Sequence, residues 1–143
     1  MMFEDIRAVY SEYTAQVARL ESERRSWEGL FGIGKRLADD PCHDRFYDEL
    51  KKLLDRYAEE KHSSEELRSV LEFIYRMPCD EGLPDGVLMP MNAVHSLTVG
   101  LAGQLAPKDA ALLLEQYTED FPKCRRFPVH KAVIRALEQA QNS

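Results

Sequence analysis

The sequence predicts an all-α fold of about six helices. Apolar residues recur at helical spacing along most of the chain. Most of the seven prolines stand at the edges of such segments, where they begin or end helices. No segment shows the strict alternation of apolar and polar residues that is typical of a half-buried strand. We therefore expect a long N-terminal helix followed by helical hairpins, packed as a compact bundle or as a short solenoid-like stack.

Residues 3–28 predict one long helix with a narrow apolar stripe. The spacing between successive apolar residues alternates between three and four, which is a heptad seam. The seam residues are Ile6, Tyr10, Tyr13, Val17, Leu20 and Trp27. Arg24 occupies a position where another apolar residue would fit. A seam this narrow is suited to packing along a partner helix, either in the same chain or in a second copy.

A proline and a capping box set the bounds of the next two helices. Pro41, preceded by Asp40 as N-cap, begins a helix that we expect to reach about Lys61. The spacing Ser63-x-x-Glu66 is a capping box and predicts a third helix directly afterwards. The apolar faces expected to be buried consist of Tyr47, Leu50, Leu53, Leu54 and Tyr57 in one helix and Leu67, Val70, Leu71 and Ile74 in the other.

The last three expected helices span residues 91–106, 108–120 and 129–141. Residues 86–107 contain no Asp, Glu, Lys or Arg, which predicts a central helix covered by the others. Gly100 and Gly103 are interpreted as points where a neighbouring helix approaches closely. The recurring polar side chains of this segment, together with Pro90, argue against a membrane span.

Length and composition predict a single domain, 1–143. Hydrophobic residues make up 44% of the chain and charged residues 31%, as in ordinary globular proteins. The three cysteines, at positions 42, 79 and 124, cannot form a complete disulfide framework, which is typical of a reducing compartment. The acidic residues near the N-terminus do not fit a signal peptide. We therefore expect a cytoplasmic protein.

No catalytic motif has all the parts that its chemistry requires. Residues 29–35 match the glycine–lysine skeleton of a phosphate-binding loop, but Arg36 stands where the magnesium-binding hydroxyl belongs. A predicted helix rather than a strand precedes the loop. No serine or cysteine stands in a recognisable nucleophile signature. We therefore assign no catalytic residue and no cofactor, and the sequence favours a non-enzymatic protein.

The cysteines and histidines provide an alternative function. They lack the paired spacing of a structural zinc site, so no metal ligand is assigned. His95 lies within the uncharged segment; if buried, it is expected to be neutral and to need a partner such as a backbone carbonyl or a serine. The alternative is a small-ligand or metal-binding protein with a pocket near the central helix, lined by His95, Cys79 and tyrosines.

Charge is distributed unevenly along the chain. The formal net charge of −6 argues against generic binding to nucleic acid. Between Phe121 and Leu137, however, there are five bases and no acid. These bases, which we call the basic cluster, are Lys123, Arg125, Arg126, Lys131 and Arg135. They either pair with acidic helices of the same fold or dock an external anionic group.

These observations together favour a non-enzymatic helical module that binds another protein. The basic cluster predicts that this partner is acidic. The N-terminal seam offers a route to a homodimer. Neither a nucleic acid nor a membrane is expected as a partner.

Overall fold

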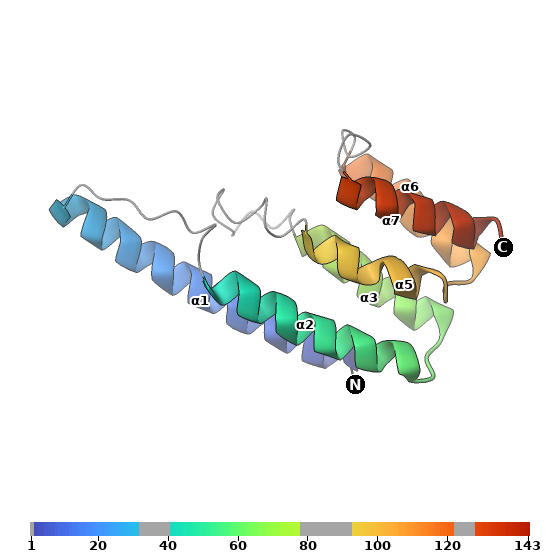
Figure 1. Cartoon of the computed structure of the whole chain (residues 1–143), viewed down its shortest axis with the longest axis horizontal. Coiled ribbons are helices and arrows are strands. Elements are labelled where there is room, and N and C mark those ends of the chain that lie inside the picture. Colours follow the sequence, from blue (N-terminus) through green and yellow to red (C-terminus); the bar gives the residue numbers. More distant parts are fainter. Residues whose placement is uncertain (1, 32–40, 78–92, 122–127) are drawn as a thin grey trace.

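Helices make up most of the described structure. The computed structural model describes residues 2–31, 41–77, 93–121 and 128–143. In chain order the elements are α1 (Met2–Phe31), α2 (Pro41–Glu59), α3 (Ser64–Arg76), the 3₁₀ helix η3 (Ala93–Thr98), α5 (Val99–Ala102), α6 (Pro107–Asp120) and α7 (Pro128–Gln141) (Figure 1). The described residues contain no strand, so the predicted all-α fold is confirmed.

The helices pack as a compact bundle around η3 and α5. Helices α1 and α2 lie side by side and run antiparallel (Figure 1). Helix α6 packs against α3 and α7, while η3 contacts α2, α3 and α7. The described part of the uncharged segment, η3 and α5, therefore lies against several other helices, as expected. The most extensive pairings join α1 with α2 and α6 with α7.

The predicted starts of the second and third helices are confirmed. Helix α2 begins at Pro41, and α3 follows the N-cap Ser63, whose Oγ accepts a hydrogen bond from the backbone N–H of Glu66 at 3.0 Å. The predicted apolar face of α3 is fully buried. On α2, the buried members are Leu50, Leu54 and Tyr57, and the half-buried ones are Tyr47 and Leu53.

The prediction of one continuous α-helix over residues 91–106 is wrong. The described part is η3 followed by the single α-turn α5. The Thr98 hydroxyl donates a hydrogen bond to the carbonyl of His95 at 2.7 Å, which competes with the regular helical pattern. Two glycines close behind lower the helix propensity further. The segment consequently adopts the tighter 3₁₀ geometry.

The predicted close approaches at Gly100 and Gly103 are also wrong. Both residues are exposed. A Cβ atom at Gly100 would meet no atom within 4 Å, and one at Gly103 would meet only the Gly100 carbonyl, at an ordinary 3.7 Å. Gly103 is the C-cap of α5, Gly100 lies within this short helix, and neither admits a neighbouring helix.

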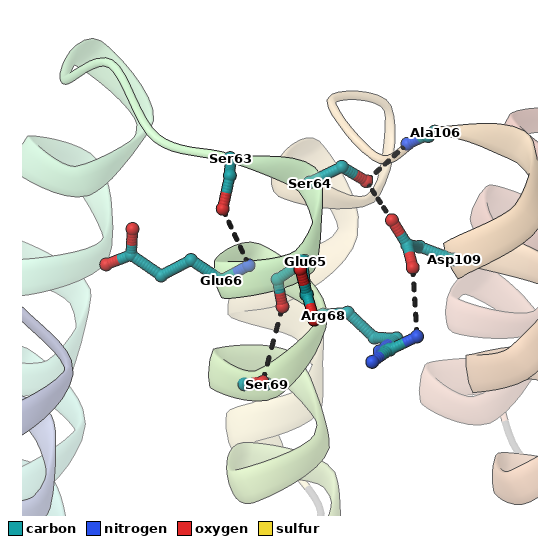
Figure 2. A network of polar contacts seen from close by, with 8 residues as sticks. All are labelled: Ser63, Ser64, Glu65, Glu66, Arg68, Ser69, Ala106 and Asp109. Atoms are coloured by element: carbon teal, nitrogen blue, oxygen red, sulfur yellow. Dashed lines mark hydrogen bonds and ion pairs between the residues drawn. The ribbon is translucent and has the colours of Figure 1, made fainter.

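A polar junction joins the first turns of α3 and α6 (Figure 2). The Ser64 hydroxyl donates to Asp109 Oδ2 at 2.5 Å and accepts a hydrogen bond from the backbone N–H of Ala106 at 2.7 Å. The other carboxylate oxygen of Asp109 accepts from Arg68 Nη1 at 3.0 Å. The Arg68 and Asp109 side chains are only 29% and 13% exposed, so this ion pair is partly shielded from water. The junction fixes α6 against α3.

We expect Asp109→Ala to lower the free energy of unfolding by about 2 kcal/mol, because the Ser64 hydroxyl and the Arg68 guanidinium lose their carboxylate. Asp120→Ala is the matched control. Its ion pair with Arg76 spans 3.4 Å and the Arg76 side chain is 55% exposed, so we expect a loss below about 1 kcal/mol. Urea unfolding of the wild type and both variants measures the difference. Equal losses would contradict the role assigned to the junction.

Candidate functional site

The structure describes two residues of the basic cluster. Lys123, Arg125 and Arg126 lie outside the described residues. Lys131 and Arg135 are four residues apart on α7, and both side chains are exposed. Neither forms an ion pair with another described residue. Because Val133 and Leu137 are buried, α7 turns its apolar side to the core and these two cations to solvent.

The N-terminal seam packs within the chain over its first part. Ile6, Tyr13 and Val17 are buried, and Tyr10 is half-buried. The ring of Tyr13 stacks on Phe46 of α2, with ring centroids 4.5 Å apart. The side chains of Leu20 and Trp27 lie outside the described residues. Helix α1 itself continues well past the start of α2 (Figure 1).

An open groove of about 470 Å³ runs between α1 and α3. We call it the α1–α3 groove. Its lining includes Phe3, Arg7 and Tyr10 from α1 and Phe73, Arg76 and Met77 from α3 and its C-cap. The rings of Phe3 and Tyr10 both meet Phe73 edge-on, with centroid distances of 5.7 and 5.6 Å. Three of the eight residues that line the groove are therefore aromatic and in contact with one another.

Both charged residues that α3 contributes to the groove contact polar side chains of α6. Glu72 also lines the groove, and its Oε1 accepts a hydrogen bond from Gln116 Nε2 at 3.1 Å. Arg76 Nε lies 3.4 Å from Asp120 Oδ2. Each of these groups thus has a polar partner behind the groove.

Arg7 differs from the two charged residues on α3. Its guanidinium carbon lies 4.5 Å from the ring centroid of Phe3 and 5.7 Å from that of Phe73. Contacts of this kind are cation–π interactions. Arg7 has no ion-pair partner among the described residues. The groove therefore presents a cation that rests on aromatic rings and is not compensated by an acid of the described structure.

A second group of polar side chains lies in the core. The Tyr117 hydroxyl is 2.9 Å from His95 Nδ1 and also hydrogen-bonds to His130 Nδ1. His95 is 0%, Tyr117 1% and His130 5% exposed. We call these three residues the His–Tyr–His cluster. A phenol has one proton, so Tyr117 donates to one imidazole and accepts from the other. The two histidines are consequently opposite tautomers.

Aromatic rings enclose the His–Tyr–His cluster. The ring centroids of Tyr75 and Phe121 lie 5.4 and 5.5 Å from that of His95. The Thr98 hydroxyl, which donates to the His95 carbonyl, lies 3.0 Å from the Tyr75 hydroxyl and can accept its proton. His95 Nδ1 thus has a partner, but the partner is a tyrosine rather than a carbonyl or a serine. The buried Nε2 atom of the same ring has no hydrogen-bond partner among the described residues.

Burial lowers the pKa of both histidines. The pKa of His95 falls from 6.5 to about 3, mainly because burial removes water from the imidazolium and further because His130 is close. The backbone carbonyls of Tyr75 and Ile74 act in the opposite direction. Burial also lowers the pKa of His130. Both imidazoles are therefore neutral at pH 7.

The metal-binding part of the alternative function has limited geometric support. Within the described ranges, no three His, Cys, Asp or Glu residues come together as a set that could hold a metal ion. Cys79, Cys124 and the side chain of Cys42 lie outside those ranges.

Among the described helices, none has both the length and the apolar character that a membrane span requires.

Comparison with known proteins assigns no family to the chain. No family model matches it, and neither a curated protein nor a solved structure does. Its function must therefore be inferred from geometry and charge.

Proposed function

We propose that this chain is a non-enzymatic helical module that binds an acidic protein through the basic cluster. The observation that supports this function is the exposed side of α7. There Lys131 and Arg135 have no ion-pair partner among the described residues. Cations that are not paired inside the fold are available to carboxylates of another protein.

The distribution of charge favours the same surface. The chain has a formal charge of −6 although the basic cluster contributes five positive charges, so the remainder carries −11. An acidic partner is repelled by most of this molecule and attracted by the basic cluster. Long-range attraction of this kind orients an encounter before contact is made.

The His–Tyr–His cluster lends no support to the small-ligand alternative. Its side chains are buried, and both Nδ1 atoms are hydrogen-bonded to Tyr117. A ligand that approached His95 would have to displace the surrounding rings. Tyr117 satisfies the two buried Nδ1 atoms, which is a structural role, and His95 Nε2 is the one ring nitrogen of His95 left without a hydrogen-bond partner among the described residues.

A homodimer, which we also propose, would use only the later part of the N-terminal seam. The seam residues up to Val17 are already packed within the chain, so a second copy would have to pair with α1 beyond that point. This part of α1 carries Leu20 and Trp27 in the sequence and extends past α2 (Figure 1).

Reversing both described charges of the basic cluster, by Lys131→Glu and Arg135→Glu, should abolish partner binding. We expect the free energy of unfolding to change by less than about 1 kcal/mol, because both side chains are exposed. Lys51→Glu with Lys52→Glu is the matched control, since it makes the same charge change at exposed positions of α2. Proteins captured from a lysate by the wild type and the control, but not by the α7 variant, are then tested as purified pairs.

The same reversal at Arg125 and Arg126 extends the test to the two arginines of the basic cluster that precede α7. We expect the same loss of binding and no loss of stability. Destabilisation by more than about 2 kcal/mol would show that these arginines pair inside the fold, and would contradict the proposal. Unaltered binding by both double variants would contradict it as well.

A further inference from the structure

We propose that the α1–α3 groove is a second docking site, which takes a segment of a partner protein that presents a carboxylate beside an apolar side chain. The groove lies on α1 and α3, whereas the basic cluster lies on and before α7, so the two proposals rest on different residues. Two properties of the groove define its occupant: an aromatic lining and a cation without an acidic partner among the described residues.

The aromatic lining favours an apolar side chain. Phe3, Tyr10 and Phe73 are only half-buried although they pack on one another, and Met77 beside them is buried. The volume of about 470 Å³ is large enough for side chains of a bound segment. An aliphatic or aromatic side chain placed there would remove water from itself and from the half-exposed rings. Grooves between helices commonly bind the apolar face of a helical segment in this way.

Arg7 selects the charge of the occupant. Its guanidinium rests against Phe3, one helical turn away on α1, so its planar face is held before a partner arrives. The N–H groups at the edge of a stacked guanidinium can still grip a carboxylate at two points. Glu72, the acidic residue of the lining, lies on α3 and hydrogen-bonds to Gln116 of α6, whereas Arg7 lies over the rings of Phe3 and Phe73. A partner group placed beside these rings therefore meets a cation. The partner group is therefore an aspartate or a glutamate.

A protein segment fits these features better than a nucleic acid does. Only one cation of the groove lacks an acidic partner in the described structure, which is too few to hold a chain of phosphates against a net charge of −6. A free carboxylate without an apolar part would leave the aromatic rings in water. A short segment that carries both groups satisfies the rings and Arg7 together.

Selection of peptides from a displayed random library, about 12 residues long, against the wild-type chain tests this inference. We expect the enriched peptides to carry Asp or Glu within about one helical turn of Leu, Phe or Trp. Their affinity should fall about tenfold for Arg7→Gln and for Phe73→Ala, which corresponds to one lost charged or apolar contact. Circular dichroism establishes that both variants are folded, and amide chemical shifts of the wild type locate the bound peptide.

Three further variants make the outcome specific. Arg56→Gln removes an exposed arginine of α2 and should leave peptide binding unchanged. Arg7→Lys keeps the charge without the two-point grip, so it should bind with intermediate affinity. The Lys131→Glu, Arg135→Glu variant should bind the peptides like the wild type, which separates this result from the test of the basic cluster.

The inference is overturned if no peptide is enriched, if the enriched peptides are basic, or if Arg7→Gln and Arg56→Gln have equal effects. It is also overturned if the wild type is a dimer that Arg7→Gln dissociates, because the occupant would then be a second copy. Peptides that shift amide signals only on α7 would place the site elsewhere and have the same consequence.

Discussion

Tyr117→Phe is expected to lower the free energy of unfolding by about 3 kcal/mol, whereas Tyr57→Phe should leave it unchanged or raise it. The Tyr117 hydroxyl hydrogen-bonds to two buried imidazoles, so its removal deletes a hydrogen bond at Nδ1 of both His95 and His130. Each unpaired buried polar group costs roughly 1–3 kcal/mol. Tyr57 is just as buried, but its hydroxyl has no hydrogen-bond partner among the described residues.

The two variants delete the same atom from the same residue type, so the comparison isolates the hydrogen bonds. Urea unfolding at pH 7 measures the two changes in free energy. Nearly equal changes for Tyr117→Phe and Tyr57→Phe would show that the His–Tyr–His cluster contributes nothing beyond packing. A large loss for Tyr57→Phe alone would reverse the assignment of the satisfied and unsatisfied hydroxyls.

Stability is expected to fall as the pH drops below about 6.5. The unfolded imidazole of His95 takes up a proton near pH 6.5, but in the folded protein its pKa is lowered to about 3. Between these values the unfolded state binds more protons than the folded state, so acid favours unfolding. The stability contributed by a neutral His95 is thus present above pH 6.5 and is lost as the pH falls towards 3.

The loss can be measured before the carboxylates titrate. A histidine in this window changes the free energy of unfolding by about 1.4 kcal/mol per pH unit, so His95 alone accounts for about 2 kcal/mol between pH 7 and pH 5. His130 acts in the same direction, since its pKa is also lowered. Urea unfolding across this range should show a shallower pH dependence for His95→Leu and an unchanged one for Tyr57→Phe. Identical slopes in the wild type and His95→Leu would contradict a buried, neutral His95.

The sequence predicts the fold class well because its signals are local. Pro41 begins a helix by its fixed backbone angle, and Ser63 begins another by accepting a backbone hydrogen bond three residues ahead. The form of the helix within residues 91–106 was harder to predict from sequence. Its apolar pattern is helical, but the hydrogen bond from the Thr98 side chain and the two glycines that follow oppose a regular α-helix. Tertiary packing decides which helical form results, and the spacing of apolar residues in the sequence carries no information about that packing.

The candidate sites are tertiary features and were largely beyond the reach of sequence. His95, Tyr117 and His130 come from three elements, and no spacing rule joins them. The uncharged segment indicated a buried His95, but nothing marked His130 as its neighbour. Arg7 and Phe73 likewise meet only after α1 and α3 pack. The heptad seam predicted that α1 lies along a helix, and tertiary structure was needed to show that α2 covers its first part.

The single proton of Tyr117 has a consequence for how energies add. If the phenol donates to His95, His130 must donate to the phenol, and reversing one hydrogen bond reverses the other. A substitution at any of the three residues therefore alters the bonding of the other two. The separate losses measured at His95, Tyr117 and His130 will not sum to the loss of the whole cluster. Three helical elements distant in the sequence are in this way joined into one cooperative unit.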